Sequence, residues 1–212
     1  MEIYALKISD IEGEFSKGEL KRLMPSFRLE AASKQQAPAK KNSSLAAGAL
    51  LGFAMKKRGV SFEETPCFSQ NGKMYFPPQH RFYVNLSHGG EYAVCALDTK
   101  EVGIDIEPVR EYREAVLKRI CSLEEMQAFL SLSKEEEKNQ AFTRLWTGKE
   151  SMVKLSGKSV AMLLDPSFCC WEKSPVYTKT YASLPGHIIS VSSHEKSFPL
   201  GITVLSLQWL LQ

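Results

Sequence analysis

The sequence predicts an α+β protein, and three features of the chain indicate this class. Runs rich in β-branched and aromatic residues occur at the start, in the middle and near the end, and helical segments separate them. The 212 residues, 43% of them apolar, can bury one large core or two small adjoining ones. Residues 186–207 also faintly repeat the pattern of residues 90–107, so an internal duplication divided near residues 100–104 is a hypothesis.

The predicted elements of the first half begin with MEIYALKI, whose alternation is typical of a strand. A short polar helix follows over residues 18–24 and ends near Pro25. The segment SSLAAGALLGFAMKK indicates a buried helix capped by Ser43 or Ser44. Three further strands are expected to form one small antiparallel sheet, at residues 82–86, 92–97 and 102–107.

The second half is expected to be helical first and β-rich afterwards. Helices are predicted over residues 113–132 and 134–155. Gly157 is expected to end the second of them as a C-cap. Three strands are predicted to follow, at residues 176–182, 187–193 and 201–207.

The charge, the apolar runs and the cysteines of the chain limit the classes of protein to which it can belong. The net charge of +3, from 27 basic and 24 acidic residues, favours an anionic partner only weakly. No apolar run approaches the roughly 20 residues of a membrane span, and the start of the chain lacks signal-peptide features, so we expect a cytoplasmic protein without a membrane partner. Five cysteines without CxxC spacing indicate neither a disulfide framework nor a zinc site.

Two carboxylates stand out in the predicted strand VGIDIE. The period of two places Asp105 and Glu107 on one face together with Gly103, about 6–7 Å apart along the strand. Such carboxylates repel each other unless a cation screens them, and Mg²⁺ is the natural choice for oxygen ligands. The alternative is a half-buried strand that shows its acids to solvent.

A second group of charged residues lies in the helical segment LWTGKESMVKLSG. Glu150 and Lys154 are four residues apart and therefore share one helix face. The simple interpretation is an exposed ion pair. Trp146 anchors this helix in the core, and Gly148 indicates close packing or the approach of a ligand, so a rigidly placed functional pair is the competing hypothesis.

Residues suited to phosphate binding come before these acids in the chain. In Asn85-Leu86-Ser87-His88-Gly89-Gly90 a predicted strand ends in a hydroxyl, an imidazole and two glycines, which can surround an anion. A plain hairpin turn is the alternative. Basic residues complete the set: Arg28, Lys34, Lys40, Lys41 and Lys73. These would also suit RNA or an acidic protein.

In chain order, these motifs resemble those of the 4'-phosphopantetheinyl transferase superfamily, in its larger surfactin-synthetase type. The family pattern is a GK turn, an N-x-SHS-like loop, a (V/I)GxDxE strand and a W-x-x-KE-(A/S)-x-x-K helix. These motifs correspond here to Gly72-Lys73, NLSHGG, VGIDIE and WTGKESMVK. The resemblance covers most of the chain and is strongest over residues 71–157. This chain departs from the pattern in having Gly89 where a second serine is common.

The resemblance implies the transfer of the 4'-phosphopantetheine group from coenzyme A, the co-substrate, to a serine of an apo acyl or peptidyl carrier protein, with release of 3',5'-ADP. It implies that Asp105, Glu107 and Glu150 bind Mg²⁺, with Mn²⁺ as the alternative ion. Glu150 is also implied to activate the attacking serine. Lys154 is implied to steady the pyrophosphate and the leaving group.

The resemblance also implies which residues bind coenzyme A. Ser87 and His88 correspond to phosphate contacts, and Lys73 corresponds to a residue near the nucleotide. The family places contacts to the 3'-phosphate in the basic segment, so candidates for that role are Arg28, Lys34, Lys40 and Lys41. Family members commonly have an arginine with a serine or threonine at the start of the first long helix, whereas Ser43-Ser44 stands here.

The implied architecture is a monomer of two pseudo-twofold-related subdomains, each a small antiparallel sheet packed against a long helix. We expect residues 1–103 and 104–212 to form them, with coenzyme A in the cleft between. Carrier proteins are typically acidic around the modified serine, which favours docking near Lys118 and Arg119. We expect no nucleic-acid partner.

Two other classes of function remain as alternatives. One is a noncatalytic homologue that binds coenzyme A or a nucleotide, although the intact acids and Lys154 disfavour it. The other is an RNA-binding module that uses the basic residues between 28 and 58. No RNP-like aromatic motif supports RNA binding.

Overall fold

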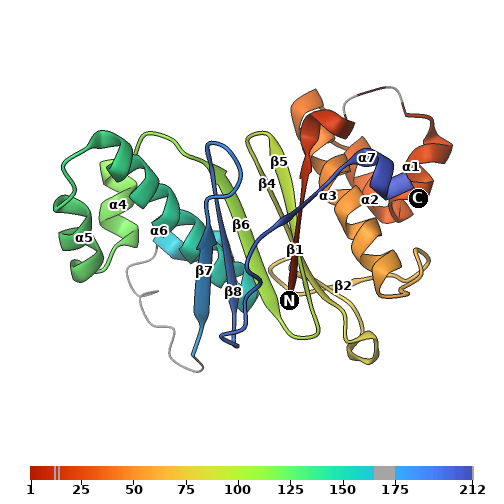
Figure 1. Cartoon of the computed structure of the whole chain (residues 1–212). Helices are drawn as coiled ribbons and strands as arrows, with labels where there is room; N and C mark the ends of the chain where they lie inside the picture. Colours follow the sequence, from red (N-terminus) through yellow and green to blue (C-terminus); the bar gives the residue numbers. More distant parts are fainter. Residues whose placement is uncertain (12, 14, 165–174, 212) are drawn as a thin grey trace.

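The computed structural model describes residues 1–11, 13, 15–164 and 175–211. Its strands form two main sheets and one short hairpin, and each main sheet packs against one long helix (Figure 1). The predicted α+β class is therefore confirmed. Two of the five cysteines, Cys169 and Cys170, lie outside the described residues.

The first sheet has the strand order β4-β5-β1-β9. Its strands are β1 (Glu2–Lys7), β4 (Tyr83–Gly89), β5 (Tyr92–Asp98) and β9 (Thr203–Leu205). The pairs are antiparallel except for β1 with β9, which is parallel. Ser87 and His88 lie inside β4, so their predicted position in a loop is wrong. The turn consists of Gly90 and Glu91 alone, because two residues are enough to connect a hairpin.

The helix on the first sheet is α3 (Pro38–Lys57), with Ala37 as its N-cap. The predicted cap at Ser43 or Ser44 is therefore wrong. Proline is favoured in the first turn because no N–H is needed there, and the polar residues after it continue the helix. Shorter helices surround α3: η1 (Ile8–Ile11), α1 (Lys17–Leu23), α2 (Ser26–Ser33) and α7 (Leu207–Leu211).

The second sheet has the order β6-β8-β7 and is antiparallel throughout. Its strands are β6 (Val102–Pro108), β7 (Tyr177–Tyr181) and β8 (His187–Ser193). We predicted one sheet for β4, β5 and β6, and this prediction is wrong. β6 pairs with β8, and in this register Val102 is opposite Ser193, which lies more than 80 positions later in the chain. Short-range patterns cannot reveal such a pairing.

The long helix of the second half is α6 (Glu135–Ser156), which ends at Gly157 in the left-handed conformation, as predicted. The single helix predicted over residues 113–132 is instead two helices, α4 (Glu114–Ile120) and α5 (Leu123–Leu130). Ser122 breaks the segment because it forms a capping box with Glu125 and starts a new helix. The remaining elements are β2 (Cys67–Phe68), β3 (Met74–Tyr75), η2 (Pro78–His80) and η3 (Val160–Leu164).

Alternation along the strands builds four layers in the order α3, first sheet, second sheet, α6. In β1, Tyr4 and Leu6 face the apolar core beneath α3, whereas Ile3 and Ala5 face a second core shared with the other sheet. The residues of β6 that enter this shared core are Val102, Ile104 and Ile106. The opposite face of β6, which carries Gly103, Asp105 and Glu107, therefore points toward α6, as the period of two predicts.

The two sheets also meet edge to edge along β4 and β6. The side-chain Oδ1 of Asn85 accepts a hydrogen bond of 2.9 Å from the backbone N–H of Ile104. A Cβ on Gly89 would lie 2.4 Å from the carbonyl oxygen of Ile106. Glycine suits this approach, because a side chain here would require the two strands to move apart.

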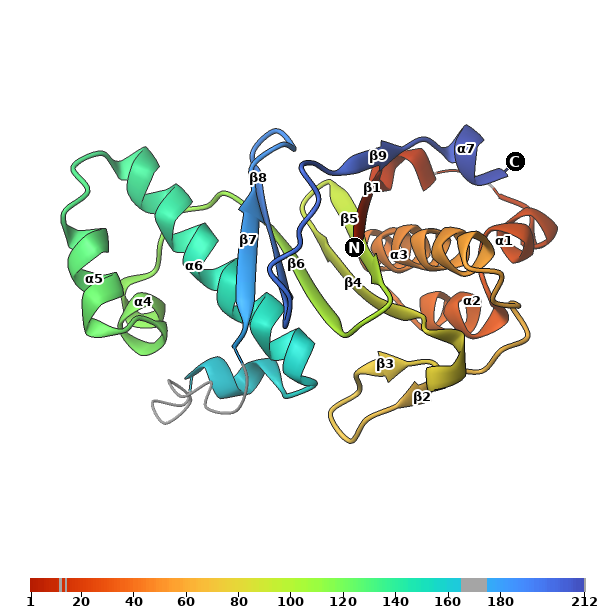
Figure 2. The same ribbon diagram turned by 60° about the horizontal axis from the view of Figure 1, so that its bottom comes forward.

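The β2–β3 hairpin reaches from the first half to the C-terminal end of α6 (Figure 2). Asn71 donates a hydrogen bond of 3.1 Å from its side-chain amide to the carbonyl of Gly157. Lys73 donates one of 2.5 Å from Nζ to the carbonyl of Leu155. These bonds satisfy carbonyls at the helix end and hold the two halves together on this side.

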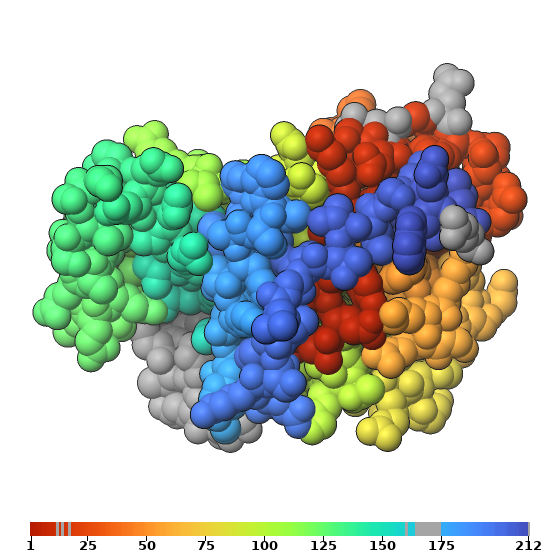
Figure 3. Space-filling model, in the orientation of Figure 1, coloured from red at the N-terminus to blue at the C-terminus, as the bar shows by residue number. Residues whose placement is uncertain are grey.

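The C-terminal part of the chain returns from the second half and lies across the first (Figure 3). It supplies β9 to the edge of the first sheet, and α7 packs near α1. The division into residues 1–103 and 104–212 stays a prediction. Within the described ranges, none of the helices combines the length and the apolarity required to cross a bilayer.

Candidate active site

Three carboxylates converge between β6 and α6. Asp105 and Glu107 extend from β6, Glu150 extends from α6, and one oxygen of each lies within 4.8 Å of those of the other two. Gly103 makes the approach possible, because a Cβ there would lie 2.0 Å from the carbonyl oxygen of Ser151. The close neighbour of Gly103 is therefore the backbone of α6.

The Asp105 carboxylate is almost fully enclosed, with 2% of the residue exposed. Its Oδ1 accepts hydrogen bonds from the Ser87 hydroxyl at 2.8 Å and from Lys154 Nζ at 2.7 Å. Its Oδ2 is buried and accepts no hydrogen bond from an N–H or hydroxyl group of the described residues, although a protonated Glu150 carboxyl can donate one to Asp105. A buried carboxylate oxygen needs a partner. Asp105 therefore offers an unused oxygen beside two further carboxylates, and this arrangement fits a divalent cation.

The other two carboxylates are destabilised as anions in the absence of a cation. Burial, the larger cause, and the neighbouring Asp105 carboxylate together raise the pKa of Glu150 to about 8. Burial also raises the pKa of Glu107, although Arg110 opposes this effect through an ion pair of 3.0 Å. A bound cation would stabilise both anions and so favour their deprotonation.

Lys154 lies among these acids and does not form the exposed ion pair that the helix spacing allows. Its Nζ donates to Ser87 Oγ at 2.9 Å as well as to Asp105. Together Ser87, Asp105 and Lys154 form a closed triangle of hydrogen bonds. Ser87 thus holds the carboxylate in place in this structure, while the phosphate contact that we predicted for it stays a prediction.

The carboxylates line one pocket of about 340 Å³, here called the acidic pocket, together with Lys154, Arg28 and His88. Arg28 reaches it from α2 and donates a hydrogen bond of 3.3 Å from Nη2 to the carbonyl of Ser44. Its Nε is buried without a hydrogen-bond partner within the described ranges, and burial lowers its pKa. An anion in the pocket would satisfy this donor.

His88 also lines the acidic pocket. Part of its surface is exposed, yet the surrounding protein lowers its pKa by desolvation, and the charges of Lys154 and Arg28 lower it further. Its ring is therefore biased toward the neutral form in this ligand-free arrangement. A phosphate beside it would reverse the sign of this effect, because an anion stabilises imidazolium.

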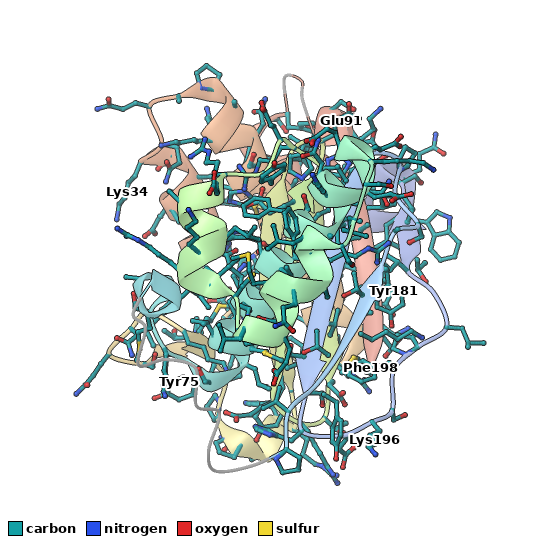
Figure 4. The ribbon with its side chains drawn as sticks, turned by 90° about the vertical axis from the view of Figure 1, so that its left-hand side faces the viewer. Lys34, Tyr75, Glu91, Tyr181, Lys196 and Phe198 are labelled. Carbon is teal, nitrogen blue, oxygen red and sulfur yellow. The ribbon has the colours of Figure 1, made fainter. Side chains whose placement is uncertain are left out.

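The remaining basic candidates lie outside the acidic pocket. Lys40 and Lys41 are exposed on the first turn of α3, and neither is among the described residues that line the acidic pocket. Lys34 is exposed at the end of α2 and lies at the outer margin of the molecule (Figure 4). The 3'-phosphate contacts expected of these three lysines stay predictions, whereas Arg28 lines the pocket.

A second pocket of about 480 Å³ adjoins the acidic pocket and shares Arg28, Leu86 and Lys154 with it. We call it the hairpin pocket, because the β2–β3 hairpin forms one wall. Lys73 lines it, and burial lowers the pKa of this lysine. Apolar side chains from β2, β3 and β4 also line it: Phe68, Met74, Val84 and Leu86. We did not predict this apolar wall, although the alternation of apolar residues in Phe82–Leu86 indicates it.

The comparisons with known proteins agree with this geometry. Residues 101–203 match the model of the 4'-phosphopantetheinyl transferase superfamily. The 4'-phosphopantetheinyl transferase Sfp of Bacillus subtilis is 33% identical over 153 residues, which cover 66% of this chain and 67% of that protein. The transferase ffp of Bacillus subtilis is 31% identical over 172 residues, 75% of this chain and 74% of its own. The transferase psf-1 of Bacillus pumilus is 26% identical over 100% of this chain and 97% of its own.

The acids, the lysine and the arginine around one pocket form a candidate site for a cation and a phosphorylated ligand. The chain belongs to the 4'-phosphopantetheinyl transferase superfamily, and within it to the Sfp type. The resemblance found in the motifs is therefore confirmed over most of the chain.

Proposed function

We propose that this enzyme transfers the 4'-phosphopantetheine group from coenzyme A to a serine hydroxyl of an apo acyl or peptidyl carrier protein and releases 3',5'-ADP. Membership of the family supports the reaction class. The observation that carries the proposal within this structure is the meeting of Asp105, Glu107, Glu150 and Lys154 in one pocket. A noncatalytic homologue that only binds coenzyme A would not need all four.

The metal ligands in this proposal are Asp105, Glu107 and Glu150, and Mg²⁺ is the expected ion, with Mn²⁺ as a substitute. The unused Oδ2 of Asp105 supports this assignment. Bound there, the ion would neutralise charge on the pyrophosphate of coenzyme A and on the departing 3',5'-ADP. Lys154 adds a positive charge at the same place and is held there by Asp105 and Ser87.

The chemical step moves one phosphoryl centre between two oxygens. The serine oxygen attacks the β-phosphorus of coenzyme A in line, and the bond from that phosphorus to the bridging oxygen of 3',5'-ADP breaks. The serine proton must be removed as the new bond forms, and Glu150 accepts it in this proposal. Glu150 suits this role because its carboxylate extends into the acidic pocket beside Lys154, where the phosphates are proposed to bind.

The two adjoining pockets divide coenzyme A between them in this proposal. The acidic pocket receives phosphate groups, with Arg28, His88 and Ser87 as their contacts. The hairpin pocket, with its apolar wall and Lys73, receives the organic part of the molecule next to those phosphates. Lys40 and Lys41 would contribute only at longer range, by attracting the anionic ligand toward the end of α3.

We also propose that the enzyme acts in the cytoplasm as a monomer, without a nucleic-acid or membrane partner. Residues from both halves line the acidic pocket, so one chain supplies a whole site. The carrier protein would dock near Lys118 and Arg119, where exposed basic side chains suit an acidic partner.

The test is intact-mass spectrometry of an apo carrier protein incubated with this enzyme, coenzyme A and Mg²⁺. We expect the carrier to gain the mass of one phosphopantetheine group. Chelation of the metal, Glu150→Gln and Asp105→Ala should each abolish the gain, while Glu63→Gln, at an exposed position, should not. If several acyl and peptidyl carriers gain no mass although the protein binds coenzyme A, the noncatalytic alternative is correct.

A further inference from the structure

Helix α6 packs on the second sheet through a buried layer of hydroxyl groups. Thr147 and Ser151 extend from α6, Ser190 and Ser192 extend from β8, and all four residues are 0% exposed. The Thr147 and Ser190 hydroxyl oxygens lie 2.8 Å apart, and those of Ser151 and Ser192 lie 2.7 Å apart. These contacts occupy places where a helix–sheet interface commonly has apolar side chains.

The direction of the first chain of hydrogen bonds is fixed because each hydroxyl has only one proton. Thr147 donates its proton to the carbonyl of Thr143 at 2.9 Å, since a carbonyl can only accept. Ser190 must then donate to Thr147. Thr180, whose hydroxyl lies 3.0 Å from that of Ser190, must in turn donate to Ser190. The chain therefore runs in one direction from β7 through β8 to the backbone of α6.

The second chain is parallel to the first and has the same direction. Ser151 donates to the carbonyl of Gly148 at 2.7 Å. Ser192 must therefore donate to Ser151, and Thr178, 2.7 Å from Ser192, must donate to Ser192. Both hydroxyl chains end on carbonyls of α6. The threonine of β7 at the start of each chain donates into it, and every later hydroxyl both accepts and donates a hydrogen bond within the chain.

Stability alone does not explain these hydroxyl groups. Replacing both partners of a buried hydrogen bond by apolar groups of the same shape is often neutral or stabilising, whereas an unmatched hydroxyl is costly. The chains instead favour one position of the helix. The step from Thr147 to Ser151 is about 6 Å along the helix. The step from Ser190 to Ser192 is about 6.8 Å along the strand. Sliding or rotating α6 would break both chains at once.

The hydroxyl chains lie directly beside the three carboxylates. In the sheet register Ser190 is opposite Asp105 and Ser192 is opposite Gly103, so each pair points toward α6. Ser151 is the residue after Glu150 and lies three positions before Lys154 on the same helix. We propose that Thr147, Ser151, Ser190 and Ser192 are positioning residues, which fix Glu150 and Lys154 relative to Asp105 and Glu107. The inference rests on the proposed metal site.

The test is the affinity of the folded protein for Mn²⁺, measured by titration with electron paramagnetic resonance, for Thr147→Val. Valine keeps the shape of threonine and removes the hydroxyl. We expect the dissociation constant for Mn²⁺ to rise about tenfold, as for groups that orient metal ligands from outside. Steady-state kinetics should show a fall in kcat that exceeds any rise in the KM for coenzyme A.

Matched controls separate positioning from simple damage to the fold. Thr143→Val removes a hydroxyl that is also buried in α6 but bonds the carbonyl of Asn139 in its own helix, and it should leave Mn²⁺ affinity unchanged. Thr147→Ser keeps the hydroxyl and should restore the wild-type dissociation constant. Ser192→Ala, which removes a single oxygen, carries the same test in the second chain, with Ser193→Ala as its control.

Equal Mn²⁺ affinities for Thr147→Val and Thr143→Val, with equal kcat, would overturn the positioning role and leave the proposed function intact. A wild-type protein that binds no Mn²⁺ would overturn the metal site itself, and this inference with it. These two failures give different results in the same titration.

Discussion

The two long helices cover their sheets with different chemistry. Every buried residue of α3 is alanine, glycine, leucine or methionine. Half of the buried residues of α6 are hydroxyl-bearing: Thr143, Thr147 and Ser151. The strand beneath α3 presents apolar side chains, whereas β6 presents Asp105 to α6. One half of the molecule therefore rests on apolar packing, and the other uses directed polar contacts.

This difference separates stability from chemistry within one architecture. Apolar contacts are not directional, and their main effect is on the stability of α3. Hydrogen bonds fix direction and distance, which a site for a cation and a phosphate requires. We therefore expect changes in the first half to alter the free energy of unfolding, and changes between α6 and β6 to alter activity.

The largest effect is expected for Lys154→Met in the second half. The change removes the positive charge beside Asp105, which is 2.7 Å away, and should lower kcat about 10²–10³-fold. Lys149→Met is the matched control, because Lys149 lies on the same helix and pairs instead with Glu125 on α5 at 2.9 Å. It should cost at most about 1 kcal/mol in stability. Similar kcat values for both variants would contradict a special role of Lys154 in the reaction.

The counterpart in the first half is Gly52→Ala. A Cβ at Gly52 would lie 1.9 Å from the carbonyl oxygen of Leu23, so the backbone must shift. We expect a loss of about 3 kcal/mol in the free energy of unfolding, measured with urea, and an unchanged Mn²⁺ dissociation constant in the folded protein. Gly148→Ala is the control. Apart from its own helix, no described atom lies within 4 Å of a Cβ there, and alanine should stabilise α6 by about 0.5–1 kcal/mol.

Arg28 connects the two regions, because it belongs to the first half and lines the acidic pocket. Arg28→Met should raise the KM for coenzyme A about 10–100-fold through the loss of a charge-assisted contact. Lys40→Met should raise it less than threefold, since Lys40 is exposed. Dephospho-coenzyme A, which lacks the 3'-phosphate, identifies the group that Arg28 binds. If Arg28→Met weakens both compounds equally, Arg28 does not contact the 3'-phosphate.

The smallest expected effect is a pH dependence of the metal-free protein. Glu150 has a pKa of about 8 when folded, against 4.5 for the free side chain. Between these two pH values the folded state therefore binds more protons than the unfolded state does. As a result, the free energy of unfolding falls as the pH rises from about 4.5 to 8. The free energies of unfolding of the wild type and of Glu150→Gln are measured by urea titration with chelator at several pH values. The difference between the two proteins should show the pH dependence that is due to Glu150. A difference that does not change with pH would contradict the raised pKa.

Local patterns predicted the parts of the site that lie within single elements. Alternation in β6 placed Asp105 and Glu107 on the face opposite the apolar residues, and the structure confirms this. The four-residue spacing placed Glu150 and Lys154 on one side of α6. These features depend on neighbours in the sequence, so the sequence contains the required information.

Contacts between distant segments could not be predicted in the same way. The pairing of β6 with β8 places the strand that carries Asp105 and Glu107 in the second sheet. This pairing joins residues that are far apart in the chain. The pattern HIISVSS shows that Ser190 and Ser192 share a face, but not whether that face meets water or a helix. Arg28 reaches the pocket because α2 packs closely on Gly48 of α3, where a Cβ would lie 3.3 Å from the Cβ of Arg28.

We propose that α6 and β6 together build one metal site. The most direct measurement is the number of Mn²⁺ ions bound per chain in the presence of coenzyme A, for the wild type and for Asp105→Asn, Glu107→Gln and Glu150→Gln. We predict one ion per wild-type chain and a large loss of affinity in each variant, because each removes one ligand. Unchanged binding in Glu150→Gln would contradict the claim, since the site would then belong to β6 alone.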